Sequence, residues 1–89
     1  MKAVVTVVGR DTVGILAKVS SACAEHNANI IDVTQSVMQD LFTMVMLVDI
    51  TDITGDFSDL QNTLYDLGEK IGMKIHVMHE DIFNSMHSI

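Results

Sequence analysis

Runs of β-branched and apolar residues alternate along the chain with stretches in which apolar residues recur at helical spacing. The first run covers residues 2–8 and stops at Gly9, which predicts a β-strand. Apolar residues then recur three and four positions apart until His26 and Asn27, which predicts a helix with one buried stripe. That stripe consists of Ile15, Leu16, Val19, Ala22 and Cys23.

Two further runs rich in β-branched residues cover residues 30–39 and 41–51, with Asn29 leading into the first. The polar pair Gln39-Asp40 separates them. Two such runs joined by so short a polar turn predict a β-hairpin.

The second half repeats the order of helix and strand. A loop with Gly55 precedes a helical pattern that Asp56 or Ser58 can cap and that Gly72 ends. Its apolar stripe is Phe57, Leu60, Leu64, Leu67 and Ile71. Residues 73–82 predict a last strand. We expect one domain over residues 1–81 and a C-terminal tail over residues 82–89, to which the pattern assigns no element.

The element order is therefore βαββαβ. It predicts an α+β fold of the ferredoxin-like kind, with a four-stranded antiparallel sheet, strands one and three in its centre, and both helices on one face. The central strands are apolar on both sides, since Val45 and Leu47 alternate with the apolar set Phe42, Met44, Met46, Val48 and Ile50. Helices can cover one face only, so we expect the other face to meet a second subunit in a homodimer.

Composition narrows the class of protein. The chain has 89 residues, is 48% hydrophobic and contains no proline, as expected for one folded domain. Its longest apolar run, Met44 to Val48, is too short for a membrane span, and the N-terminus lacks the features of a signal peptide. The single cysteine, Cys23, has no intrachain partner, which is consistent with the reducing cytoplasm.

Charge argues against nucleic acid as a partner. The formal net charge is −7, and the five basic residues are scattered, so a phosphate backbone would be repelled. If the protein regulates gene expression, we expect it to act through another protein or a small molecule.

The stretch GRDTVGIL, residues 9–16, carries the most chemistry. Gly9 and Gly14 allow a close approach to the backbone, and the first amides of the following helix can receive a carboxylate. Arg10 and Asp11 add one charge of each sign, which suits a zwitterion such as an amino acid. A helix terminus contributes only about 0.3–1 kcal/mol, so a second wall is required, which a partner subunit can supply. The alternative is a plain turn in which Asp11 caps the helix.

The segments GRDTVGIL, NANIIDVTQ and FTMVMLVDI together resemble those of an ACT domain, over about residues 2–80. The chain is similar to the small stand-alone members and to the glycine-cleavage repressor-like group. The resemblance implies a βαββαβ fold, pairing of subunits, no cofactor, and sensing of an amino acid or related metabolite at the pair interface. The ligand contacts it implies are Arg10, Asp11, Thr12, Val13 and Gly14 in the loop, and Asn29 and Ile30 at the entry to strand two.

Two positions depart from many amino-acid-binding members, which have proline in place of Val13 and an amide in place of Asp11. A carboxylate at position 11 removes a hydrogen-bond donor and places negative charge near a ligand carboxylate.

An alternative function is an ACT module without a ligand, used for assembly or protein contact. A further alternative is an acylphosphatase-like enzyme using Arg10 and Asn29. Asp11 would repel a phosphate, so we expect no enzymatic activity.

The other candidate clusters favour structural roles. His76 and His79 are three residues apart in a predicted strand and therefore point to opposite faces, so we expect no metal site. The methionines predict packing, and Cys23 predicts a buried thiol. Asp49, Asp52 and Asp56 lie at the exit of strand three and predict a solvated edge, with a weak cation contact as the alternative.

Overall fold

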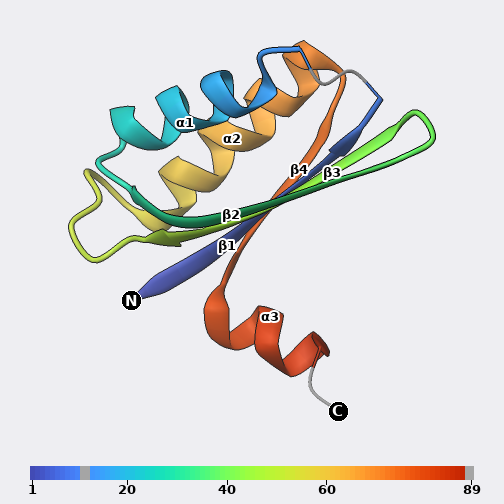
Figure 1. The fold of residues 1–89 in the computed structure, drawn as a ribbon. Coiled ribbons are helices and arrows are strands. Elements are labelled where there is room, and N and C mark those ends of the chain that lie inside the picture. The colour runs from blue at the N-terminus through green and yellow to red at the C-terminus, as the bar shows by residue number, and fades with distance from the viewer. Residues whose placement is uncertain (11–12, 88–89) are drawn as a thin grey trace.

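The four strands form one antiparallel sheet in the order β2-β3-β1-β4 (Figure 1). The computed structural model describes residues 1–10 and 13–87. The strands are β1 (Lys2–Gly9), β2 (Asn29–Met38), β3 (Leu41–Asp49) and β4 (Lys74–His79). Strands one and three are central, as predicted, and the turn at Gln39-Asp40 closes the predicted hairpin between Met38 and Leu41.

Two helices, α1 (Ile15–Glu25) and α2 (Phe57–Ile71), cover the same face of the sheet (Figure 1). Helix α2 ends at Gly72, whose φ of 72° gives a left-handed C-cap. At its start, the backbone N–H of Asp56 donates to the carboxylate of Asp59 at 3.0 Å. The predicted fold, α+β with both helices on one face, is confirmed.

The core lies between the helices and the sheet. Met44, Met46, Leu60 and Leu64 are its largest fully buried side chains. Methionine fills irregular gaps between strands and helices, which explains two of the seven methionines. On the other face of the sheet Val4 is also buried, whereas Val45 and Leu47 are half-buried.

The last strand is shorter than predicted. It ends at His79, which pairs with Ala3, and residues Glu80–His87 form helix α3. The acidic pair Glu80 and Asp81 favours the start of a helix at this point, because carboxylates near a helix N-terminus interact favourably with the helix dipole. Helix α3 lies on the side of the sheet opposite to α1 and α2 (Figure 1). Because it covers Glu80–His87, the boundary expected between residues 81 and 82 falls inside a helix. No helix in the described ranges has the length and apolar character needed to span a membrane.

Candidate functional site

The loop after β1 begins beside the tip of the β2–β3 hairpin. Gly9 pairs with Phe42 at the end of the sheet, and the guanidinium of Arg10 lies 3.6 Å from the carboxylate of Asp40. Both side chains are largely exposed, at 83% and 70%, and an exposed ion pair contributes only about 0.2–1 kcal/mol. Arg10 can therefore leave Asp40 and bind another anion with only a small loss of free energy.

Gly14 is the N-cap of α1, with a φ of 70°, a left-handed conformation that glycine adopts without strain. Asp11 and Thr12, both predicted as ligand contacts, lie outside the described residues, and so does the alternative in which Asp11 caps the helix. Val13 is exposed beside Gly14.

Asn29 and Ile30 lie at the other end of the sheet. Asn29 pairs with Asp49, which in turn pairs with Lys2 at the start of β1. The loop follows Gly9 at the end of β1, and seven residues of strand span roughly 23 Å. One chain therefore holds the two halves of the predicted site apart.

A polar hollow of about 340 Å³ surrounds Asn29. It is lined by Asn27, Asn29, Asp49 and Asp52. The side-chain amide of Asn27, a residue with a φ of 58°, donates to the backbone oxygen of Asp52 at 2.9 Å. This contact joins the turn after α1 to the loop after β3, so neither local stretch of sequence predicts the hollow.

Asp49 is the most strongly held carboxylate of this hollow. It accepts hydrogen bonds from the hydroxyl of Thr51 at 2.6 Å and from the backbone N–H of Thr51 at 2.9 Å. The N-terminal ammonium of Met1 donates in turn to the Thr51 hydroxyl at 2.9 Å. These contacts, the Thr51 hydroxyl first, hold the pKa of Asp49 below its ordinary value, so the hollow stays negatively charged at neutral pH.

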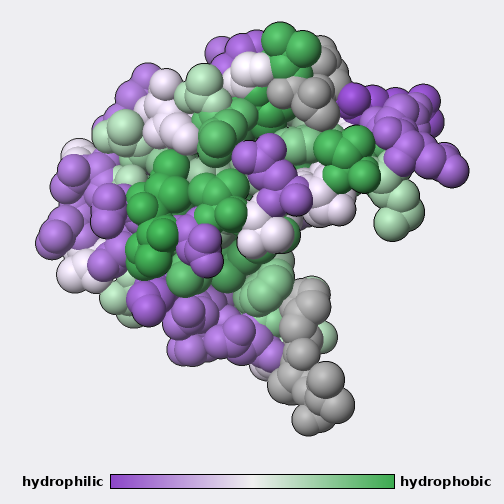
Figure 2. Space-filling model, in the orientation of Figure 1, coloured by the Kyte–Doolittle hydropathy of each residue, from purple (hydrophilic) through white to green (hydrophobic). Residues whose placement is uncertain are grey.

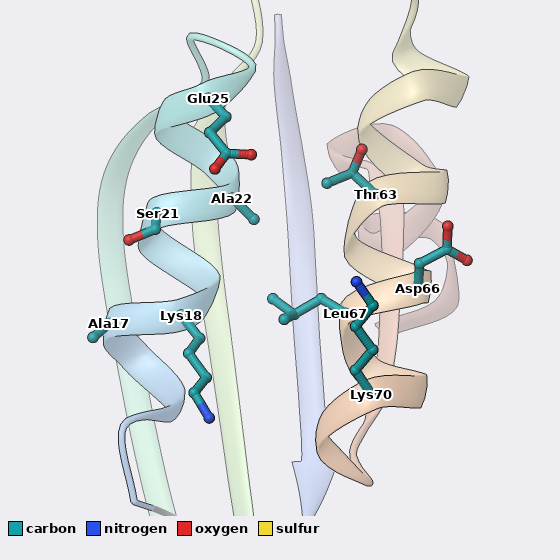
Figure 3. A pocket seen from close by; sticks show the side chains of 9 residues that line it. All are labelled: Ala17, Lys18, Ser21, Ala22, Glu25, Thr63, Asp66, Leu67 and Lys70. Atoms are coloured by element: carbon teal, nitrogen blue, oxygen red, sulfur yellow. The ribbon is translucent and has the colours of Figure 1, made fainter.

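A larger groove of about 560 Å³ runs between α1 and α2 on the outer surface of the helix layer (Figure 3). Ala22 of α1 and Leu67 of α2 point into it (Figure 3). Its charged lining residues are Lys18, Glu25, Asp66 and Lys70. Near Glu25, a hydrogen bond of 2.8 Å between His26 Nε2 and Thr63 Oγ1 joins the two helices. The sequence pattern marks these residues only as the polar sides of two amphipathic helices.

The histidine and cysteine candidates occupy structural positions. The ring of His79 stacks on Phe57 of α2 at a centroid distance of 4.3 Å, whereas His76 is exposed on the strand. Cys23 is fully buried, and burial raises the pKa of its thiol to about 11. Cys23 is thus a packing residue, as predicted, and not a nucleophile.

The comparisons with known proteins agree with this architecture. A family model described as an ACT domain matches residues 2–78. A UPF0237 protein of Methanococcus maripaludis is 55% identical over 86 residues, which cover 97% of this chain and 96% of the relative.

Solved structures point the same way. An ACT domain protein from Streptococcus pneumoniae has 41% identity and a TM-score of 0.81, with 93% of each chain covered. A putative glycine cleavage system transcriptional repressor has 29% identity and a TM-score of 0.68, covering 85% of this chain and 43% of that one. The resemblance expected from the sequence is confirmed, and this chain belongs to the ACT domain family.

Proposed function

We propose that this ACT domain is a cytoplasmic regulatory module that pairs with a second copy and senses an amino acid or related metabolite at the interface. The separation of the two site halves supports this proposal most directly. The loop that contains Arg10 and Gly14 and the strand entry at Asn29 lie at opposite ends of one sheet. A second chain placed antiparallel to the first would bring the loop of one copy next to the strand entry of the other.

The free edge of β2 is the surface suited to such pairing. It has ten residues, and its exposed apolar side chains include Ile31, Val37 and Met38, at 47%, 63% and 73%. Long apolar edge strands pair readily with another strand because their outer N–H and C=O groups lack partners. Strand β2 runs along the near side of the molecule in Figure 1, and Figure 2 shows hydrophobic side chains gathered on that side.

A twofold axis through paired β2 strands makes them antiparallel. Met38 of one copy then lies beside Asn29 of the other, and the loop after Gly9 lies at the Met38 end of its own chain. Each interface would therefore contain two equivalent sites, each built from the loop of one copy and the strand entry of the other. This arrangement uses the sheet edge, whereas the sequence led us to expect the open sheet face as the dimer contact.

The two halves complement the two ends of an amino acid. Arg10 and the first backbone amides after Gly14 can receive a carboxylate, and the carboxylates of Asp49 and Asp52 can receive an ammonium group. A ligand bound to both copies stabilises the pair over single chains, or one pair arrangement over another. That shift in population is the signal which a partner protein would read.

Thermal unfolding with the twenty amino acids and with folate and purine metabolites tests ligand binding. A ligand at a hundredfold excess over its Kd stabilises the folded state by about 2.7 kcal/mol, which for so small a domain raises Tm by roughly 10–20 °C. A flat response in a dimeric protein favours the assembly module. Turnover of acetyl phosphate that Arg10→Ala abolishes favours the enzyme.

Mixing two variants tests whether the site is shared. Arg10→Ala and Asn29→Ala should each abolish the response to the ligand identified above. In a one-to-one mixture, half of the dimers combine both chains, and each of these holds one site with both residues intact. About a quarter of the wild-type binding capacity should return. No recovery, with exchange of chains shown by size and mass, would contradict a site made by two copies. Glu69→Ala, exposed on α2, is the matched control.

A further inference from the structure

The groove between α1 and α2 has the size of a small-molecule site and lies away from both halves of the site proposed above. Its volume of about 560 Å³ is within the range of ligand pockets. Ala22 of α1 points toward α2 across this space, whereas Ala17 and Ser21 point to the other side of α1 (Figure 3). Leu67 reaches from α2 into this space and stays half-exposed (Figure 3).

The charges of the groove are sorted by sign along its length. Lys18 and Lys70 lie at one end, and Glu25 lies at the other, beside Thr63 (Figure 3). The carboxylate of Asp66 points away from α1. None of these charged side chains forms an ion pair with any residue that the structure describes.

Basic residues are scarce in this chain. Only five of its residues are lysine or arginine, against twelve acidic residues. Two of those five, Lys18 and Lys70, line one groove with no carboxylate paired to them among the described residues. An anionic group bound at their end of the groove would attract both ammonium groups.

We propose that this groove binds an extended zwitterion of about tripeptide length. The carboxylate lies at Lys18 and Lys70, the ammonium lies at Glu25, and an apolar centre rests on Leu67. Lys18 and Glu25 are seven residues apart on α1, which corresponds to about 10 Å along the helix. An extended tripeptide spans roughly 10 Å, whereas a single amino acid is too short to reach both ends. The hydroxyl of Thr63 lies on the α2 side of the groove and can bind a peptide group (Figure 3).

Backbone amide NMR with the tripeptide Gly-Leu-Gly tests the proposal on the full chain. We expect shifts of resonances from residues 17–25 and 63–70. N-acetylated and C-amidated forms of the same peptide each lose one charge, so each should bind more weakly, by up to about fivefold. An equimolar mixture of free glycine and leucine should not shift these resonances. Equal binding of the blocked and free peptides, or shifts confined to the region of Asn29, would overturn the proposal.

Variants separate the groove from the rest of the molecule. Lys70→Gln and Glu25→Gln should each weaken tripeptide binding by up to about fivefold, and Leu67→Ala, which removes the apolar side chain that reaches into the groove, should weaken it as well. Glu69→Gln, also exposed on α2 but outside the lining, should bind as the wild type does. Unchanged affinity in Lys70→Gln and Glu25→Gln would refute the proposal. Dimerisation and the Tm response to a metabolite should persist in all four variants, so failure here leaves the proposed function intact.

Discussion

Gly68 of α2 lies directly against the backbone of Met73. The carbonyl oxygen of Gly68 accepts a hydrogen bond from the N–H of Met73 at 2.9 Å. A Cβ on Gly68 would come within 2.7 Å of the Met73 carbonyl oxygen and 3.0 Å of Ile75 Cγ1. Helix α2 can pack closely on the start of β4 because position 68 has no side chain.

Gly68→Ala should therefore destabilise the fold, although alanine is the better helix former. The gain in helix propensity is about 1 kcal/mol. A contact with backbone cannot relax as a flexible side chain does, and such overpacking costs about 1–3 kcal/mol. Because the contact is with a backbone oxygen at 2.7 Å, we expect a cost in the upper part of that range and a net loss of about 1–2 kcal/mol in the free energy of unfolding, measured by urea denaturation.

Gly72 is the matched position for that test. A Cβ there meets nothing within 4 Å, but the φ of 72° is unfavourable for alanine. Gly72→Ala should cost about 1 kcal/mol, and Gly72→Asn less, because asparagine tolerates this conformation. A Gly68→Ala variant as stable as the wild type would show that the helix shifts freely over β4.

Asp49 should contribute stability that depends on pH. Its folded pKa is lower than its ordinary value of 3.8, so its contribution is present above that value and is lost as pH falls through the folded pKa. Thr51→Val removes the hydroxyl donor, so the pKa of Asp49 should rise toward the ordinary value. The stability difference between wild type and variant should be present at neutral pH and shrink in acid.

Carboxyl NMR titration of Asp49, together with urea denaturation across the acid range, measures both effects. Thr54→Val lies in the same loop and is exposed, and it should leave the titration of Asp49 unchanged. A titration midpoint for Asp49 that is the same in wild type and Thr51→Val would contradict this role of the hydroxyl.

Cys23 should be inert toward thiol reagents while the chain is folded. Burial raises its pKa from 9.0 to about 11, which lowers the thiolate fraction at neutral pH by about a hundredfold, and its side chain has no exposed surface. Release of thionitrobenzoate from Ellman's reagent should be slow in native protein and rapid in guanidinium chloride.

A neighbouring thiol provides the control for that measurement. The double variant Cys23→Ala with Ala24→Cys places the thiol one position along α1, where the side chain is exposed. This variant should react rapidly in the native state. Equal native rates for Cys23 and the thiol at position 24 would mean that α1 opens easily.

Asp59 should be important for the start of α2. Its carboxylate accepts from the N–H of Asp56 at 3.0 Å and lies in the first turn, near the positive end of the helix dipole. Asp59→Ala should cost about 0.5–2 kcal/mol, measured as a loss of Tm by circular dichroism. Asp66→Ala, exposed in the middle of the same helix, should have a much smaller effect, and equal losses would argue against the cap.

Local patterns were sufficient to predict most of the fold. The stripe that includes Val19 and Cys23 and the stripe that includes Leu60 and Leu64 predicted both helices, and all four residues are buried. The pair Gln39-Asp40 predicted the hairpin. These signals are local because each depends on the backbone period of a single element. The error at residues 80–82 arose because the predicted strand was continued to Ile82, whereas Glu80 and Asp81 form the first turn of helix α3.

The amino-acid sequence by itself determined the order of elements, the apolar stripes and the resemblance to the ACT family, because each of these depends on residues that are close together along the chain. Only the tertiary structure decided which chemical groups meet. Antiparallel pairing placed Gly9 and Asn29 at opposite ends of the sheet, and the crossing of chain segments brought Asn27 to Asp52 and Lys18 to the groove beside Lys70. Such contacts depend on strand register and helix packing, which bring together residues far apart in sequence. They therefore produce no periodic pattern along the chain.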